Sequence, residues 1–175
     1  GGDKEIFDRV FIWSTYNMLM EDKNLFSWLY GEKNAGTNKL GVIDKANATD
    51  ADEDIALALL FAHKRWGEEQ YLTWARKIIK DIWKYHVIEI NGTYYLTSGT
   101  NSIFGPLINP SYFSPAGYRI FAQVDKEHDW NKLADDSYKT LNRLVNNKAF
   151  QNENNLVPNW FALSNNGEIS SARAV

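Results

Sequence analysis

Apolar residues recur every three or four positions in five segments of the chain, and this spacing predicts five helices. The segments are residues 4–20, 50–66, 68–86, 115–125 and 129–146. Asp129 stands where it can cap the fifth helix, because an aspartate side chain accepts hydrogen bonds from the first free N–H groups of a helix. The pattern therefore indicates a mainly α-helical fold.

The segment 50–66 differs from the other four because its apolar residues point in nearly every direction around the helix axis. They include Ile55, Leu57, Leu59, Leu60 and Phe61, with alanines between them. A helix that is apolar all round is buried all round. We therefore expect an interior helix whose first turn opens on an interior end or on the floor of a cleft.

The remaining segments lack the helical period. Asn91-Gly92 stands between alternating apolar residues in the segment 88–99, which is typical of a β-hairpin with a type I′ turn. The segment 24–47 is rich in glycine and asparagine and is expected to be a loop, although it carries three aromatic rings. The segment 150–169 is expected to form a short helix or a strand.

The first turn of the 50–66 helix carries the densest negative charge of the chain: Asp50, Asp52, Glu53 and Asp54. One explanation is capping, with Thr49 and Asp52 forming a capping box and the acids adding about 0.3–1 kcal/mol each through the helix dipole. However, Asp50 and Asp54 lie four residues apart, a like-charge spacing that costs roughly 0.2–0.5 kcal/mol. Capping thus explains four acids poorly, and a functional carboxylate is favoured for at least one of them.

Composition excludes several classes of function. The 175 residues carry a net charge of −3 without a basic stripe, which disfavours nucleic acid as a partner. No apolar run approaches the roughly 18 residues of a membrane span. The chain has no cysteine, so it can form no disulfide or thiolate metal site. Aromatic residues make up 14% of the chain, and we expect some of them to line a groove for a partly apolar ligand such as a sugar ring.

We expect neither a metal nor a cofactor. Asp50, Asp52 and Asp54 match the first positions of an EF-hand loop, but Ile55 stands where that loop needs glycine and Phe61 where it needs glutamate. The three histidines have no paired spacing. A phosphate-binding glycine loop and a Gly-x-Ser-x-Gly motif are both missing from the sequence.

Three stretches resemble glycoside hydrolase family 8, whose members act on β-1,4-linked polysaccharides. They are ATDADEDIALALLFAHKRW (48–66), NPSYFSPAGYRIFA (109–122) and FDRVFIWSTYNML (7–19). The resemblance implies part of an (α/α)6 barrel with one small β-hairpin, and an inverting hydrolase. Inversion needs a general acid and a general base whose carboxyl groups lie about 6.5–9.5 Å apart.

The resemblance also implies roles for residues of this chain. Asp50 matches the acid of the family signature and is expected to hold the sugar at the cleavage point in a distorted conformation. The family's general acid precedes the opening helix and its base follows a stretch like SSARAV (170–175). We therefore expect residues 1–175 to be a partial catalytic domain that is inactive alone. Trp28, Phe104 and Tyr112 are expected to contact the substrate, because pyranose rings stack on aromatic faces.

Two hypotheses stay open at this point. The first is an endo-β-1,4-glucanase-like glycosidase that is secreted or held in the cell envelope. The second is a non-catalytic carbohydrate-binding or scaffold remnant of the same fold. In both, the expected partners are a polysaccharide or oligosaccharide and either the missing part of the barrel or a swapped dimer.

Overall fold

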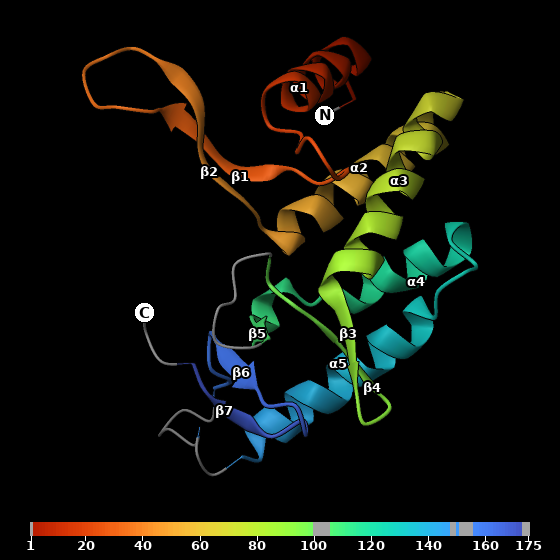
Figure 1. Cartoon of the computed structure of the whole chain (residues 1–175). Helices are drawn as coiled ribbons and strands as arrows, with labels where there is room; N and C mark the ends of the chain where they lie inside the picture. Colours follow the sequence, from red (N-terminus) through yellow and green to blue (C-terminus); the bar gives the residue numbers. More distant parts are fainter. Residues whose placement is uncertain (1, 100–105, 148–149, 151–155, 173–175) are drawn as a thin grey trace. The chain divides into compact units, whose positions relative to one another are not determined.

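The computed structural model describes residues 2–99, 106–147, 150 and 156–172. The chain divides into two compact units, Gly1–Ile82 and Trp83–Val175, and the boundary falls within a helix. Figure 1 shows a mainly helical protein with small antiparallel sheets. The five predicted helices are all present, with ends that differ by up to three residues from the predicted ones.

Three helices build the first unit: α1 (Lys4–Asn17), α2 (Thr49–Trp66) and α3 (Glu69–His86). The Phe7 ring of α1 lies 5.3 Å from the Trp66 ring and 5.6 Å from the Tyr71 ring, centroid to centroid, so it joins all three helices. The Tyr71 hydroxyl also donates a hydrogen bond to Asp8. Aromatic packing and this partly buried hydrogen bond therefore fix α1 on α2 and α3.

The prediction that α2 is buried on every side is wrong for this chain. Ala56, Leu59 and Leu60 are buried, whereas the opposite face, with Ala58 and Phe61, is exposed. The Phe61 side chain keeps 56% of its surface accessible. The reason is that the described residues supply packing partners for one face of this apolar helix only.

The segment expected to be a loop forms an antiparallel hairpin of β1 (Ser27–Glu32) and β2 (Leu40–Asn47). Ser27 is paired with Asn47 at its open end. At the turn, Gly36 adopts a φ of 78° and Asn38 a φ of 55°, in the left-handed region that glycine and asparagine tolerate. The loop prediction was therefore wrong, since the glycines and asparagines belong to the turn and not to the whole segment.

The second unit contains the predicted hairpin and two helices. Strands β3 (Val87–Ile90) and β4 (Thr93–Leu96) meet at Asn91 and Gly92, whose φ values of 51° and 74° are those of a type I′ turn. Helices α4 (Pro115–Val124) and α5 (Trp130–Val145) pack against each other. Asp129 caps α5 as predicted, accepting a hydrogen bond of 2.9 Å from the Lys132 N–H.

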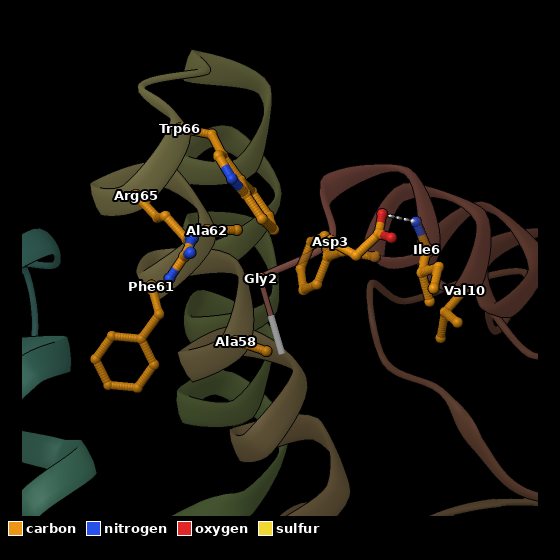
Figure 2. A pocket seen from close by; sticks show the side chains of 10 residues that line it. Gly2, Asp3, Ile6, Val10, Ala58, Phe61, Ala62, Arg65 and Trp66 are labelled. Carbon is orange, nitrogen blue, oxygen red and sulfur yellow. Dashed lines mark hydrogen bonds between the residues drawn. The ribbon is translucent and has the colours of Figure 1, made fainter.

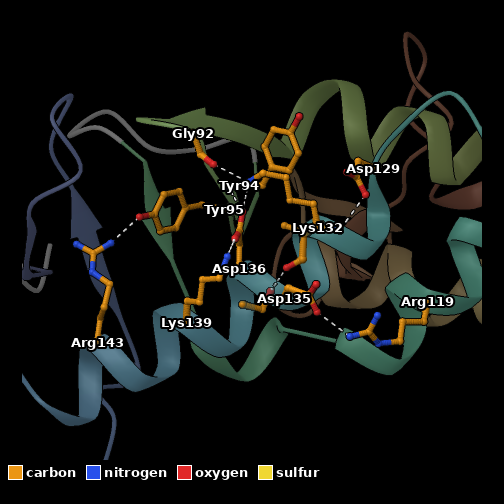
Figure 3. A network of polar contacts seen from close by, with 12 residues as sticks. Gly92, Tyr94, Tyr95, Arg119, Asp129, Lys132, Asp135, Asp136, Lys139 and Arg143 are labelled. Carbon is orange, nitrogen blue, oxygen red and sulfur yellow. Dashed lines mark hydrogen bonds and ion pairs between the residues drawn. The ribbon is translucent and has the colours of Figure 1, made fainter.

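A buried carboxylate joins α5 to this hairpin (Figure 3). Asp136 accepts hydrogen bonds from the Tyr94 N–H at 2.9 Å, from Lys139 Nζ at 2.8 Å and from Lys132 Nζ. Burial alone would raise the pKa of Asp136, but these donors outweigh it and hold the pKa below its ordinary value. The hairpin is thus tied to α5 by the Tyr94 N–H and by Lys132, whose Nζ also donates a hydrogen bond of 2.6 Å to the Gly92 carbonyl.

A third sheet completes the second unit. Strand β5 (Leu107–Ile108) pairs with β6 (Phe161–Leu163), which pairs with β7 (Ile169–Ser171). A 3-10 helix, η1 (Pro110–Tyr112), follows β5. One core cluster of this unit packs around the sheet and contains Tyr95, Ile108, Leu144, Phe161 and Leu163. The segment 150–169 therefore contributes strand β6 and the first residue of β7, and the described residues form three small sheets where one hairpin was predicted.

Candidate functional site

The candidate site begins at the first turn of α2, where the acidic cluster lies. The helix starts at Thr49, and Ala48 is its N-cap residue, without a side-chain capping bond. The predicted capping box of Thr49 and Asp52 is therefore wrong. The Asp52 carboxylate instead accepts hydrogen bonds from donors at the open end of the β1–β2 hairpin. These donors take the place of the water molecules that would solvate an exposed carboxylate.

Asp52 has no exposed surface and accepts two hydrogen bonds of 2.8 Å, one for each carboxylate oxygen. The donors are the Phe26 N–H, next to the first residue of β1, and the Asn47 side-chain amide at the end of β2. Burial raises the pKa of Asp52 to about 7, and the nearby Asp50 charge raises it as well, while the two donors lower it.

Asp50 lies two residues before Asp52 and is half-buried. Its Oδ1 atom is buried and accepts no hydrogen bond from the described residues. Leaving a buried acceptor without a donor costs about 1–3 kcal/mol, and more for a charged group. A hydroxyl group of a ligand would supply the missing donor, so this oxygen is suited to binding a polyhydroxylated molecule.

Trp28 is on strand β1 and keeps 51% of its surface exposed. Its indole lies close enough to the side chain of Asp44 on β2 to affect the pKa of that carboxyl. The backbone N–H of Ala46, and then this indole, lower the pKa of Asp44, which keeps the acceptor charged. The ring therefore lies beside a charged carboxylate with much of its surface open to a ligand.

The other two predicted aromatic residues lie elsewhere. Tyr112 is in η1 of the second unit, and its ring meets the Trp160 ring edge-to-face at a centroid distance of 5.9 Å. Phe104 lies outside the described residues. The structure thus places Asp50 and Trp28 in the first unit and Tyr112 in the second.

The residues that the structure describes contain neither a cluster suited to a metal ion nor a helix suited to a membrane span. In that part of the chain, His, Asp and Glu side chains do not gather in groups of three or more that could hold a metal ion. None of the described helices is both long and apolar enough to cross a membrane.

The comparisons with known proteins identify the family. The family model described as "Glycosyl hydrolases family 8" matches residues 1–175. The chain belongs to this family. Endoglucanase C of Ruminiclostridium cellulolyticum is 34% identical over 162 residues, which cover 91% of this chain and 33% of that protein. Endoglucanase A of Acetivibrio thermocellus is 40% identical over 120 residues, 67% of this chain and 24% of that protein.

Solved structures of the family agree with the fold. An endo-β-1,4-glucanase from an Achatina fulica gut metagenomic library is 30% identical, with a TM-score of 0.82 over 98% of this chain and 52% of that one. A family 8 endoglucanase from Klebsiella pneumoniae is 28% identical, with the same TM-score over 98% of this chain and 53% of that one. These relatives have the predicted (α/α)6 barrel. The chain spans about a third of these curated relatives at most, and about half of the solved chains.

Sequence reasoning missed two parts of the site. It did not find that Asp52 receives donors from the start of β1 and the end of β2, or that Asp44 lies beside the Trp28 indole. A signal for the hairpin was present, because the turn residues of 34–38 separate two segments that contain aromatic or β-branched residues. The contacts of Asp52 and Asp44 depend on strand register, which no local pattern specified.

Proposed function

We propose that the protein containing this chain is a hydrolase of β-1,4-linked glucan, and that residues 1–175 are part of its catalytic domain. Membership of the family and similarity to endoglucanases support the reaction and the substrate class. The observation that carries the proposal is the Asp50 oxygen on the first turn of α2, which is buried and accepts no hydrogen bond from the residues that the structure describes. It stands within the ATDADED stretch that resembles the family signature.

In this proposal Asp50 binds the sugar ring at the point of cleavage. Its free oxygen accepts hydrogen bonds from ring hydroxyls and favours a distorted ring, which moves the substrate towards the transition state. The proton donor and the base come from residues outside 1–175. They act on opposite faces of the ring, so the anomeric configuration inverts.

Aromatic rings bind the neighbouring sugars of the polymer. Trp28 offers an open face beside Asp44, and the C–H groups of a pyranose pack on such a face. Tyr112 and Phe104 are proposed to make similar contacts. Because every sugar unit of a glucan chain has the same apolar faces, a series of rings suits a polymeric substrate.

Two variants of the full-length protein test the role of Asp50. Asp50→Asn should lower the turnover of cello-oligosaccharides by orders of magnitude, because a neutral amide replaces the charged acceptor. Asp54→Asn, an exposed acid in the next turn, is the matched control and should retain activity. A full-length protein that folds but releases no sugar from soluble β-glucan would contradict the proposal. Proton NMR tests inversion, because an inverting enzyme that cuts a β linkage should release the α anomer of the product first.

The remaining part of the catalytic domain is proposed to cover an apolar face of α1 and α2. This face contains a pocket of about 480 Å³ lined by Ile6, Val10 and Phe61, among others (Figure 2). Ile6 is 57% exposed and Val10 60%. Burying such residues stabilises a protein by about 1.5–3 kcal/mol each. The solved relatives have nearly twice as many residues as the chain, and we propose that the corresponding segment of the same polypeptide packs here.

Thiol labelling tests this packing, since residues 1–175 contain no cysteine. In a full-length protein freed of other cysteines, Phe61→Cys should react slowly with a maleimide, whereas Glu69→Cys should react fast. Glu69 is a suitable control because its side chain is 79% exposed at the start of α3. Fast reaction at both positions contradicts the proposal. Slow reaction of Phe61→Cys only at concentrations where the protein dimerises indicates a swapped dimer.

We also propose that the protein acts outside the cytoplasm, secreted or in the cell envelope. A polysaccharide is too large to cross a membrane, so an enzyme that cuts it must meet it outside. Fractionation of the producing cells tests this: the protein should appear in the medium or envelope fraction, and recovery in the cytoplasm alone contradicts it.

A further inference from the structure

Asp52 connects the first turn of α2 to the start of β1 and to the end of β2. Its Oδ1 accepts the Phe26 N–H and its Oδ2 accepts the Asn47 amide, both at 2.8 Å. Asn47 is the register partner of Ser27, the residue after Phe26. The carboxylate therefore closes the open end of the β1–β2 hairpin and fixes it on α2.

Both proposed sugar contacts of this unit lie next to that junction. Trp28 is two residues beyond Phe26 on β1, and Asp50 lies between Asn47 and Asp52. We propose, on the basis of the proposed function, that Asp52 is a positioning residue that sets Trp28 and Asp50 at the separation required by one bound glucan chain. Asp52 is fully buried, so it acts through these two residues without touching the substrate.

A carboxylate suits this position better than any other side chain of its size. Both partners are N–H donors, and a carboxylate accepts through both oxygens. An asparagine at position 52 would still accept the Phe26 N–H, but its own NH2 group would face the NH2 group of Asn47. The two amides can then pair only if Asn47 turns its oxygen towards position 52, which changes how the end of β2 is held on α2.

A reciprocal exchange tests the role of Asp52 in the full-length protein. Asp52→Asn should lower kcat/KM for cellopentaose by about 100-fold, the loss typical of a displacement of about 1 Å at a reacting centre. The double variant Asp52→Asn/Asn47→Asp restores a donor facing an acceptor and should regain at least about tenfold of that loss. Weaker substrate binding in Asp52→Asn should accompany the lower kcat, because Trp28 is displaced together with Asp50.

A control separates positioning from stability. Asp136→Asn removes a buried carboxylate that accepts a backbone N–H in the second unit, where it joins α5 to the β3–β4 hairpin. All rates are expressed per folded molecule, at a temperature where circular dichroism shows every variant folded. Asp136→Asn should lose stability and keep its kcat/KM.

Each outcome decides the question. Unchanged kcat and KM in Asp52→Asn, with a lower melting temperature, overturn the inference and leave the proposed function standing. A double variant as inactive as the single one also overturns it, since the charge at position 52 would then act directly. If Asp52→Asn does not fold, the double variant carries the same test. A wild-type protein without hydrolysis overturns the proposed function and the inference with it.

Discussion

Replacing Asp52 by asparagine should remove a large part of the pH dependence of stability. Burial raises the pKa of Asp52 in the folded protein to about 7, against 3.8 when the group is free. The folded state therefore holds the proton more tightly than the unfolded state. The resulting stability is fully present below about pH 4 and is lost as the pH rises through 7.

The size of this effect follows from the two pKa values. They differ by about three units, and each unit corresponds to about 1.4 kcal/mol, so the free energy of unfolding should fall by up to roughly 4 kcal/mol between pH 4 and 8. Asp52→Asn cannot titrate at this position. The difference in unfolding free energy between wild type and variant should therefore decrease with pH by that amount.

Urea unfolding of the full-length protein, followed by tryptophan fluorescence at half-unit steps of pH, measures this difference. Other carboxylates titrate alike in both proteins and cancel. Leu59→Ala is the control, because it empties a buried site of the same helix without removing a titrating group, and its difference curve should be flat. Parallel curves for wild type and Asp52→Asn would refute the assignment of a raised pKa to this carboxyl.

Three further substitutions test other parts of the first unit. Trp28→Ala should weaken cello-oligosaccharide binding about tenfold, or ~1.4 kcal/mol, in isothermal titration calorimetry, with little change in melting temperature; unchanged affinity removes it from the groove. Tyr71→Phe deletes the hydrogen bond to Asp8 and should destabilise the protein by about 1–2 kcal/mol in urea unfolding. Gly67→Ala should cost about 1 kcal/mol, because Gly67 ends α2 with a φ of 75° and a Cβ there meets no other atom; a neutral result would show that the helix end relaxes.

The sequence by itself determined the elements whose signals are local. Helix α3 and the Asn91-Gly92 turn were predicted because hydrophobic spacing and turn chemistry depend only on neighbouring residues. The Asp129 cap is equally local. The signature stretch with Asp50 indicated the family, which the comparison of the whole chain confirmed.

Only the tertiary structure decided what the acidic side chains contact. The spacing of Thr49 and Asp52 fits a capping box, but Asp52 instead binds Phe26, which is 26 residues away, and Asn47. Strand register brought these donors to Asp52, and register depends on long-range pairing that no short pattern specifies. The sequence likewise did not predict the exposed face of α2. Apolar residues indicate that a helix is covered by other segments, but they do not indicate which segment covers each face.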